Sequence, residues 1–445
     1  MRFSAADLAA ALTDRNLHGR TARLVGPDVA IDGATFDSRE VRPGQLFVPL
    51  VAERDGHDFI PDALAAGASA YLTSRTDVIE RCGGSAILVA DTAEALIDAA
   101  GWGRTLFPAS TVVIGITGSV GKTTTKDLVA AALASELAVT ANVRSFNNEQ
   151  GLPVTILNAP LDTRALVLEM GMRGFGQIAD LCRIARPSIG VVTRVGEAHT
   201  ELVGGIEGVA RAKGELVEAL PPQGWAVLNA DDERVRAMVH RTSAPSILFG
   251  EAADADVRIE SLVLDATGCA SFDIVTRDGR TPIRLSTPGR HTASNAAAAF
   301  AVGHVLGVSA SAMAAALSGA SVSDRRMQAR RTRAGAVLLD DSYNANPTSM
   351  AAALETLAAL DADRRVAVLG VMAEIDDPAD GHARIARLAA GLGVELIAVD
   401  TDLYGVASST LDQAIARVSD LGVECAVLVK ASRSSRLDRV VDAIA

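Results

Sequence analysis

A glycine-rich loop near residue 120 contains the residue types that phosphate binding needs. The segment GSVGKTT follows the apolar run VVIGIT and precedes KDLVAAALAS, which favours a helix. At such a junction, small residues let backbone N–H groups close around phosphate oxygens at a helix N-terminus. Lys122 can add positive charge near the terminal phosphates, and the hydroxyl of Thr123 suits Mg²⁺. The predicted phosphate contacts are Gly118, Ser119, Val120, Gly121, Lys122, Thr123 and Thr124.

The loop departs from the common P-loop pattern at one position. G-x-x-x-x-G-K-[ST] needs a glycine five residues before Gly121, where this chain has Ile116. The shorter pattern T-G-x-x-G-K-T fits from Thr117 to Thr123. This form resembles the ATP loop of the Mur ligases, which are ATP-dependent enzymes that form amide bonds in peptidoglycan synthesis. The alternative, a helix-start loop without a ligand, leaves the Lys-Thr-Thr sequence unexplained.

Further segments resemble the same family over most of the chain. They span residues 37 to 350 and continue more weakly to LVKASR near the end. The segments are DSREVRPGQLFVPL, DGHDFIPDALAAGA, NNEQGLPVTIL, LVLEMGMRGFGQI, GEAHTELVGGIEGVARAKGEL, GRHTASNAAAAFA and DDSYNANPTSM. Of these segments, DDSYNANP best distinguishes between the branches of the family. It is similar to the branch of the family that adds D-alanyl-D-alanine, whereas the branch that adds the third peptide residue usually has an Asp-Tyr-Ala-His type of segment.

The resemblance implies an enzyme that uses ATP and Mg²⁺. ATP is expected to phosphorylate the terminal carboxylate of UDP-N-acetylmuramoyl-tripeptide, and the amine of D-alanyl-D-alanine is expected to attack the acyl phosphate. A related ligase stays open as an alternative, either the one that adds the third peptide residue or another acid–amino-acid ligase, such as a folyl-glutamate ligase. A non-catalytic nucleotide switch would also use the loop, but it would leave Glu169, His199 and Lys213 without a role.

Three residues resemble the metal and acyl-phosphate site of the family. Glu169 ends the apolar run ALVLE, where a charge needs a partner and where a carboxylate can reach a nucleotide-bound Mg²⁺. His199 resembles a family Mg²⁺ ligand, although a loop histidine is more often a structural hydrogen-bonding residue. Lys213 matches a lysine that is carbamylated in the family; its helix alone would suggest a solvated lysine paired with an acid. The expected metal ligands are Thr123, Glu169, His199 and Lys213, and the expected catalytic residues are Lys122, Lys213, His199 and Arg326.

Four residues resemble family contacts to the nucleotide. Asn295, in GRHTASN, matches a contact to adenine, with capping or packing of the alanine-rich helix as the alternative. Arg326, in DRRMQ, resembles an arginine of the third domain that reaches the ATP phosphates on closure. Because three more arginines lie nearby, it could instead be a solvated charge. Asp341 and Tyr343, in DDSYNANP, resemble contacts to ribose and adenine.

The remaining candidates resemble substrate contacts. Arg39 suits a diphosphate because its guanidinium donates to two oxygens at once, whereas the Asp-Gly-His segment could be only a turn. The expected UDP contacts are Ser38, Arg39, Asp55, Gly56 and His57. The expected contacts near the peptide carboxylate are Asn147 and Asn148, and those to the dipeptide are Asn344, Asn346 and Ser349. Two departures from the family, Val371 in place of an acid and Ala431 in place of glycine, bear on recognition of the dipeptide.

These residues require an α/β scaffold. Strand-like apolar runs alternate with helical stretches, which is the pattern of mostly parallel sheets covered by helices. We predict three domains: a small α/β UDP-binding domain over residues 1–108, a central mostly parallel-sheet ATPase domain over 109–316, and a C-terminal Rossmann-like ligase domain over 317–445. The polar stretch SVSDRRMQARRTRAG leads into the last of these.

The composition fits this interpretation and argues against other classes. Hydrophobic residues make up 49% of the chain and charged residues 22%, a balance that supports folded cores. A net charge of -12 and an aromatic content of 3% argue against nucleic-acid binding. The four cysteines lie far apart, which suggests neither a zinc site nor a dense disulfide framework. No apolar stretch reaches about 18 uncharged residues, so we expect no stable membrane insertion. The separated cysteines fit a reducing cytoplasm, and we expect a monomer there.

Overall fold

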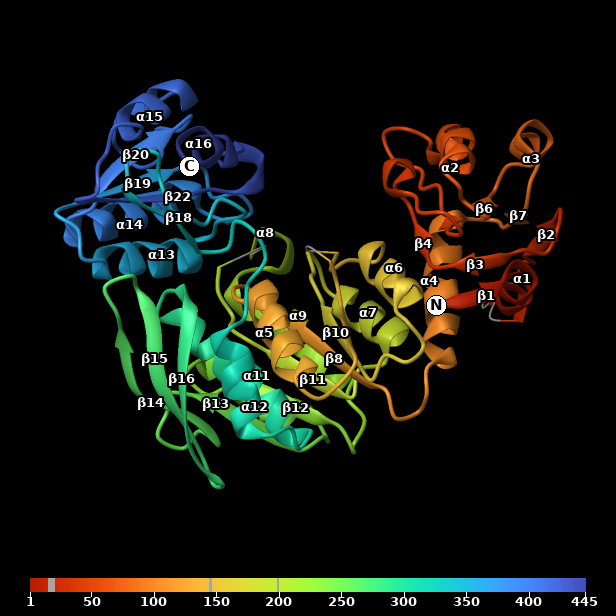
Figure 1. Cartoon of the computed structure of the whole chain (residues 1–445), viewed down its shortest axis with the longest axis horizontal. Helices are drawn as coiled ribbons and strands as arrows, with labels where there is room; N and C mark the ends of the chain where they lie inside the picture. Colours follow the sequence, from red (N-terminus) through yellow and green to blue (C-terminus); the bar gives the residue numbers. More distant parts are fainter. Residues whose placement is uncertain (15–20, 144–145, 198–199) are drawn as a thin grey trace. The chain divides into compact units, whose positions relative to one another are not determined.

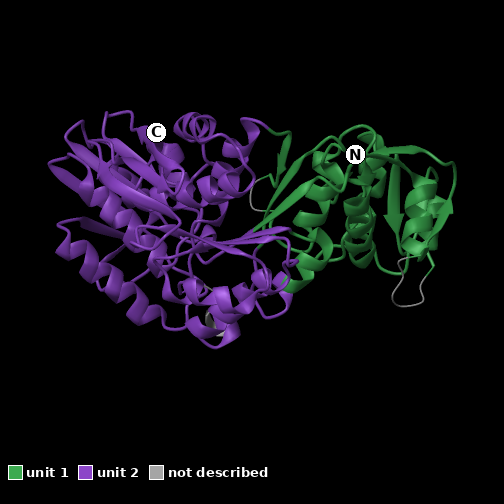
Figure 2. Cartoon of the chain, turned by 90° about the horizontal axis from the view of Figure 1, so that it is seen from below, with its two compact units in different colours: residues 1–115, 137–170, 179–187 green, residues 116–136, 171–178, 188–445 purple. Residues whose placement is uncertain are grey.

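The computed structural model describes residues 1–14, 21–143, 146–197 and 200–445. The chain forms two compact units, which Figure 2 draws in different colours. Unit 1 comprises residues 1–115, 137–170 and 179–187. Unit 2 comprises residues 116–136, 171–178 and 188–445.

The first part of unit 1 contains a five-stranded sheet in the order β2-β7-β6-β5-β4 (Figure 1). Its neighbours pair in parallel except β2 and β7, and β1 pairs separately with β3. The strands are β1 (Arg2–Ser4), β2 (Arg23–Val25), β3 (Ala30–Asp32), β4 (Ala34–Thr35), β5 (Leu46–Phe47), β6 (Ala70–Thr73) and β7 (Ala86–Leu88). The helices are α1 (Ala5–Asp14), α2 (Ile60–Ala65), α3 (Thr76–Cys82) and α4 (Thr92–Leu106), with 3-10 turns η1 (Ser38–Glu40) and η2 (Gly56–Phe59).

Local sequence explains several of these elements. Asp91 begins α4 because its carboxylate accepts the backbone N–H groups of Ala93 and Glu94, which have no partner within the helix. All four residues of β6 are buried, as expected for a parallel strand covered on both faces. Tyr71 of β6 packs with Phe47 of β5 in the core. Capping by Asp91 therefore accounts for the start of α4, and the run of apolar residues accounts for the buried strand β6.

Asn158 connects two parts of unit 1 that are far apart in the sequence. It ends α6 (Gly151–Asn158). Its Oδ1 accepts from Nε2 of Gln45 at 3.0 Å and from the N–H of Ala34 at 3.2 Å. Its Nδ2 donates to the carbonyl of Ala34 at 2.7 Å and to that of Val154 at 2.8 Å. One amide thus satisfies both backbone groups of Ala34, at the start of β4.

The largest sheet has nine strands in the order β16-β15-β14-β13-β12-β11-β8-β10-β9. The pairs from β11 to β14, and β9 with β10, are parallel, whereas β14, β15 and β16 are antiparallel. Its strands are β8 (Val112–Thr117), β9 (Val139–Ala141), β10 (Ala165–Glu169), β11 (Ile189–Val192), β12 (Trp225–Asn229), β13 (Ser246–Gly250), β14 (Val257–Leu264), β15 (Cys269–Thr276) and β16 (Gly279–Pro288). The remaining helices up to residue 318 are α5 (Lys122–Ala134), α7 (Gln177–Ala185), α8 (Thr200–Val203), α9 (Ile206–Glu218), α10 (Glu233–Arg236), η3 (Ala237–Arg241), α11 (His291–Val305) and α12 (Ala310–Ser318).

The last part of unit 2 contains a six-stranded sheet in the order β17-β18-β22-β19-β20-β21. All its pairs are parallel except that of the edge strand β17. The strands are β17 (Gln328–Arg331), β18 (Val337–Asp340), β19 (Arg364–Leu369), β20 (Glu395–Val399), β21 (Ser408–Ser409) and β22 (Cys425–Lys430). The helices are α13 (Pro347–Ala359), α14 (Pro378–Gly391), α15 (Leu411–Val418) and α16 (Asp438–Ile444), with the turn η4 (Arg433–Ser435).

Alternate residues of this sheet pack into two separate cores. Leu339 lies in the core that includes Leu354 of α13, and Leu338 lies in the core that includes Val440 of α16. A parallel sheet with helices on both faces is the Rossmann-like arrangement that the sequence predicts. The predicted fold class, α/β with several mostly parallel sheets, is confirmed. Within the described ranges, no helix combines the length and apolar character needed to cross a membrane.

We expect Asn158→Ala to lower the free energy of unfolding by about 2 kcal/mol, because it leaves the backbone groups of Ala34 and the amide of Gln45 without their partner. Urea denaturation followed by circular dichroism measures the change. Gln223→Ala, at an exposed position, is the control and should change stability by less than about 0.5 kcal/mol. A loss at Asn158 no larger than this control would contradict the assignment.

Candidate active site

The predicted phosphate loop, residues Gly118–Thr124, joins β8 to α5. Gly121 is the N-cap of α5 with a φ of 82°, and Gly118 has a φ of 153°. Residues with a Cβ rarely adopt such values. A glycine N-cap has no side chain that could accept the first N–H groups of the helix. Those N–H groups and the positive end of the helix dipole therefore suit an anion such as a phosphate.

The segment after β11 forms hydrogen bonds with the phosphate loop. The hydroxyl of Thr193 donates to the carbonyl of Val120 at 2.6 Å. The N–H of Ser119 donates to the carbonyl of Arg194 at 2.7 Å, and its hydroxyl donates to the carbonyl of Gly196 at 2.9 Å. Ser119 and Thr193 are both buried. These bonds set the shape of the loop in advance, which lowers the entropic cost of binding a ligand.

Lysine is rare in this chain and occurs only at positions that are wholly or partly buried. Of the 42 lysine and arginine residues, four are lysine: Lys122, Lys126, Lys213 and Lys430. Lys122 is half-buried, and the other three are each 2% exposed. A buried amine loses its hydration, so it requires an anion, a set of acceptors or the loss of its proton. The contacts of each lysine therefore indicate what its charge does.

Lys213 lies on the buried face of α9, close to Lys122. Burial lowers the pKa of the Lys213 amine well below its usual value, and the positive charge of Lys122 lowers it further. Lys122 donates from Nζ to the carbonyl of Gly118 at 2.8 Å, within the loop. A neutral amine is the form that can combine with CO₂. An anion at this position would relieve the repulsion between the two amines.

Three predicted nucleotide-site residues come together at the start of α5. Nη2 of Arg326 donates to Oγ1 of Thr123 at 3.2 Å. The guanidinium of Arg326 lies 4.0 Å from the centroid of the Tyr343 ring, within the range of a cation–π contact. Arg326 is therefore not a solvated charge of its arginine-rich stretch. It brings a cation from the last part of unit 2 to the phosphate loop.

Asn295 packs behind the loop from α11. It is 7% exposed, and its Oδ1 accepts from Oγ1 of Thr125 at 3.2 Å. A Cβ at Gly121 would lie 2.5 Å from the same Oδ1, so the close approach of α11 requires glycine at that position. The side chain of Asn295 thus supports the helix start, which is the packing role that the sequence left open. Contact with adenine stays a prediction.

Both carboxylate oxygens of Asp341 have partners within the protein. Oδ1 accepts the N–H of Met327 at 3.1 Å, and Oδ2 accepts from Nζ of Lys430 at 2.5 Å. The preceding Asp340 is buried at the end of β18, and burial raises the pKa of its carboxyl. Contact of Asp341 with ribose stays a prediction. In the structure, the side chain links Met327 to Lys430.

Two of the three residues predicted to bind the dipeptide begin α13. The N–H of Ser349 donates to Oδ1 of Asn346 at 2.9 Å, and the N–H of Asn346 donates to Oγ of Ser349 at 3.1 Å. This reciprocal pair is a capping box. The third, Asn344, is exposed. It is the member of the set whose side chain remains most accessible to a ligand.

Glu169 and Asn147, which were predicted for different roles, meet in unit 1. Glu169 is 1% exposed at the end of β10, and its Oε1 accepts from Nδ2 of Asn147 at 2.7 Å. Its backbone N–H donates to Oδ1 of Asn142 at 2.7 Å. Oδ1 of Asn148 accepts the N–H of Gly151, the first residue of α6, at 3.0 Å. The amide of Asn147 thus holds the carboxylate of Glu169, and the amide of Asn142 holds its backbone.

The side chains of Asp55 and His57 hold each other in unit 1. Nδ1 of His57 lies 2.6 Å from Oδ1 of Asp55, and His57 is 1% exposed. The N–H of Ser74 donates to Nε2 of His57 at 3.2 Å, so the neutral ring carries its proton on Nδ1. Gly56 donates its N–H to the carbonyl of Leu50. These contacts match the turn that the sequence left open, and UDP binding here stays a prediction.

The other predicted UDP residues lie in η1. Ser38 is half-buried, and Arg39 is exposed. Arg39 donates from Nε and Nη2 to the two carboxylate oxygens of Asp37 at 2.8 and 2.6 Å. A diphosphate would have to compete with Asp37 for this guanidinium. The remaining metal candidate, His199, lies outside the described residues.

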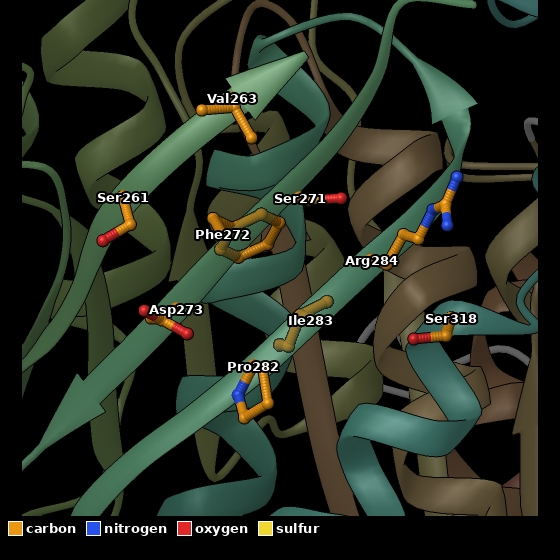
Figure 3. A pocket seen from close by; sticks show the side chains of 9 residues that line it. All are labelled: Ser261, Val263, Ser271, Phe272, Asp273, Pro282, Ile283, Arg284 and Ser318. Atoms are coloured by element: carbon orange, nitrogen blue, oxygen red, sulfur yellow. The ribbon is translucent and has the colours of Figure 1, made fainter. Parts of the chain in front are cut away.

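A hollow of about 410 Å³ lies beside the antiparallel strands β14–β16 (Figure 3). It is lined by Ser261, Val263, Ser271, Phe272, Asp273, Pro282, Ile283, Arg284 and Ser318. None of the predicted site residues is among them. Its charged side chains are paired, Asp273 with Arg280 at 2.7 Å and Arg284 with Asp265 at 3.2 Å. The hollow therefore offers no free charge to a phosphate and is separate from the candidate site.

Sequence reasoning missed two residues that shape the site. Thr193 supports the phosphate loop, and Lys430 reaches Asp341 and the carbonyl of Asn344. A signal for Lys430 exists, because it ends the buried run CAVLV as Glu169 ends ALVL. A polar residue after a buried strand, such as Thr193 after IGVV, is a weaker signal that many loops share.

Comparisons with known proteins match three segments of the chain. The matching family models are the Mur ligase family, catalytic domain (residues 30–101), the Mur ligase middle domain (residues 116–303), and the Mur ligase, glutamate ligase domain (residues 325–444). A relative from Mycobacterium tuberculosis, named UDP-N-acetylmuramoyl-tripeptide–D-alanyl-D-alanine ligase, is 38% identical over 468 residues. The alignment covers 92% of this chain and 91% of that relative.

Two solved structures are similar over nearly the whole chain. MurF from Acinetobacter baumannii gives a TM-score of 0.88 at 28% identity, covering 99% of this chain and 98% of that one. MurF ligase from Thermotoga maritima in complex with ADP gives a TM-score of 0.80 at 29% identity, covering 92% of this chain and 96% of that one. The three-domain architecture of these relatives agrees with the predicted fold class.

We expect Lys122→Ala to abolish ATP-dependent turnover. Removing a cation beside a transferring phosphoryl group should raise the barrier by about 3 kcal/mol or more, roughly 100-fold in rate. Initial rates of ADP release measure the loss, and thermal unfolding shows whether the variant is folded. Near-normal turnover in a folded variant would refute the assignment of the loop.

Proposed function

The chain belongs to the Mur ligase family, and from that premise we propose that it joins D-alanyl-D-alanine to UDP-N-acetylmuramoyl-tripeptide. It is an ATP-dependent ligase of peptidoglycan precursor synthesis. The name of the relative from Mycobacterium tuberculosis and the similarity to two MurF structures support these substrates.

The reaction has two steps. An oxygen of the terminal tripeptide carboxylate attacks the γ-phosphorus of ATP, so that an acyl phosphate forms and ADP leaves. The amine of D-alanyl-D-alanine then attacks the acyl carbon, and phosphate departs. The nitrogen loses a proton as the amide forms. In such transfers the protein contributes mainly by positioning the reactants and stabilising charge.

The observation that carries the proposal is the arrangement of cationic groups at the start of α5. Lys122 lies in the phosphate loop, and Arg326 reaches Thr123 from the last part of unit 2. Charge on the transferring phosphoryl group is spread over its oxygens, so donors from different directions stabilise it better than one alone. The N–H groups at the start of α5 add fixed dipoles to the same site.

Mg²⁺ is the metal that these residues fit. In unit 2, the hydroxyl of Thr123 and a carbamate on Lys213 would hold it. Glu169, in unit 1, and His199, outside the described residues, stay ligands predicted from the family resemblance. Hard cations prefer oxygen ligands, and Mg²⁺ usually binds one or two carboxylates together with phosphate oxygens. When bound, the metal would neutralise phosphate charge during transfer.

The two departures from the family have different consequences for the dipeptide end. Ala431 is accommodated, because its methyl group faces Gly370, where a Cβ would lie 2.8 Å away. Val371 contributes its backbone carbonyl to the N–H of Ser432 at 2.9 Å, while its side chain offers no charge. Recognition of the dipeptide ammonium therefore falls to other groups, with the exposed Asn344 as the best-placed candidate.

A reducing compartment fits the cysteines. Cys82, Cys182, Cys269 and Cys425 are all free thiols, and the last three are buried. Disulfides are rare where glutathione and thioredoxin keep thiols reduced. We place the reaction in the cytoplasm.

We expect Lys213 to act through a carbamate. Because the chain has four lysines, ¹³C-labelled bicarbonate should give few carbamate resonances in an NMR spectrum, and the resonance of Lys213 should be absent from Lys213→Ala. That variant should have little activity, and a short carboxylic acid should partly restore it. An unchanged spectrum in Lys213→Ala, together with no rescue by the acid, would exclude the carbamate.

We expect D-alanyl-D-alanine to exceed D-alanine, L-lysine and diaminopimelate as acceptor with the UDP-tripeptide. A single amino acid reaches fewer polar groups, and each hydrogen bond that it fails to make costs about 0.5 to 1.5 kcal/mol. Amine-dependent ADP release measures the preference. A preference for a diamino acid on a UDP-dipeptide would identify the chain as the ligase for the third peptide residue instead.

A further inference from the structure

The linker that leads into β17 contains two strained residues on either side of Arg326. Arg325 has a φ of 61° and Met327 a φ of 54°. A Cβ makes this left-handed region unfavourable, so such residues persist only where the surrounding structure imposes them. Arg326, between them, is the residue that contacts Thr123. The groups that fix this segment therefore decide where the guanidinium of Arg326 points.

One lysine–aspartate pair fixes the linker before the strained turn. Oδ2 of Asp127 accepts the N–H of Ser323 at 2.8 Å and its hydroxyl at 2.7 Å. Oδ1 of the same carboxylate lies 3.0 Å from Nζ of Lys126. Asp127 and Lys126 are both in α5, which begins at the phosphate loop. Ser323 is thus attached directly to the helix that presents the loop.

A second lysine–aspartate pair fixes the linker at the turn itself. Oδ1 of Asp341 accepts the N–H of Met327 at 3.1 Å, and Oδ2 accepts from Nζ of Lys430 at 2.5 Å. Lys430 also donates to the carbonyl of Asn344 at 2.8 Å. Burial lowers the pKa of Lys430, whereas the charge of Asp341 raises it. Lys430 therefore joins the DDSYNANP segment to the end of β22.

The two pairs use the same arrangement. In each, one carboxylate oxygen faces a lysine that is 2% exposed, and the other accepts a backbone N–H of the linker. A carboxylate that is neutralised and held from one side is a fixed acceptor on the other. The two residues held in this way, Ser323 and Met327, lie before and after Arg326 in the sequence.

We propose that the Lys126–Asp127 and Lys430–Asp341 pairs are positioning elements, which hold the linker so that Arg326 reaches the phosphate loop. The pairs touch the linker and do not donate to the reacting groups themselves. The inference rests on the proposed function in one respect, namely that Arg326 stabilises the transferring phosphoryl group. It assigns a role to Lys126 and Lys430, two of the four lysines of the chain.

A double-mutant cycle with Lys430→Met and Arg326→Ala tests the proposal. Lys430→Met should lower kcat about tenfold or more. Any change in the KM for the acceptor should be the same in both backgrounds, because it would come from the bond of Lys430 to the carbonyl of Asn344 and not from Arg326. In the Arg326→Ala background the same substitution should lower kcat by less than about threefold, because residues that act as a unit are not additive. Equal factors in both backgrounds would overturn the proposal.

Tyr404→Phe is the matched control for loss of a buried polar contact. Tyr404 is buried, and its hydroxyl donates to the carbonyl of Gly370 at 2.8 Å; neither residue belongs to the linker. Its effect on kcat should be the same with and without Arg326. Should Lys430→Met fail to fold, Lys430→Gln replaces it under the same criterion, because its neutral amide is polar but does not neutralise the carboxylate of Asp341.

Hydrogen exchange gives a readout that does not depend on the ligase reaction. The amide of Met327 should exchange at least about tenfold faster in Lys430→Met than in the wild-type protein, and no faster in Tyr404→Phe. Unchanged protection of Met327 would refute the positioning role even if activity falls. If the wild-type protein lacks ligase activity while the Met327 amide still exchanges faster in Lys430→Met, the proposed function fails. The positioning role of the Lys430–Asp341 pair then stands.

Discussion

Burial of lysine charge is the constraint on which the site depends. An amine in the interior needs a compensating group, and the four lysines of this chain meet that need in three ways. Lys126 and Lys430 face carboxylates, whereas Lys122 donates to a loop carbonyl. Lys213 faces the charge of Lys122, so its amine is pushed towards the neutral form. The first two pairs fix the backbone, and the last two amines create a site that an anion stabilises.

Much of the fold could be predicted because its signals are local. The parallel strands β8, β10, β11 and β12 are short apolar runs, and the glycine-rich loop follows the first of them directly. The antiparallel strands β14–β16 were not singled out, since half-exposed residues interrupt their apolar pattern. Strand β17 has the sequence QARR at a sheet edge. Pairing with β18 forms it, and no hydrophobic pattern indicates that pairing.

The site was predictable only where chemistry and local structure coincide. Thr123 and Arg326 were named from separate segments, and the structure brings them into contact. Asn346 and Ser349 were assigned to a ligand although the spacing Asn-x-x-Ser before a helix also indicates capping. The bond between Asp127 and Ser323 joins residues 196 positions apart. Such a contact has no local signal, because only the packed tertiary structure brings the two residues together.

The central claim is that burial and the charge of Lys122 lower the pKa of the Lys213 amine, and that an anion entering the site raises it again. Calorimetric titration with an unreactive ATP analogue, in CO₂-free buffers of different ionisation enthalpy at about pH 8, counts the protons taken up on binding. Phosphate charge should raise the pKa of the amine, so we predict net proton uptake by the wild-type protein and its loss in Lys213→Met. Equal proton exchange by the two proteins would contradict the account.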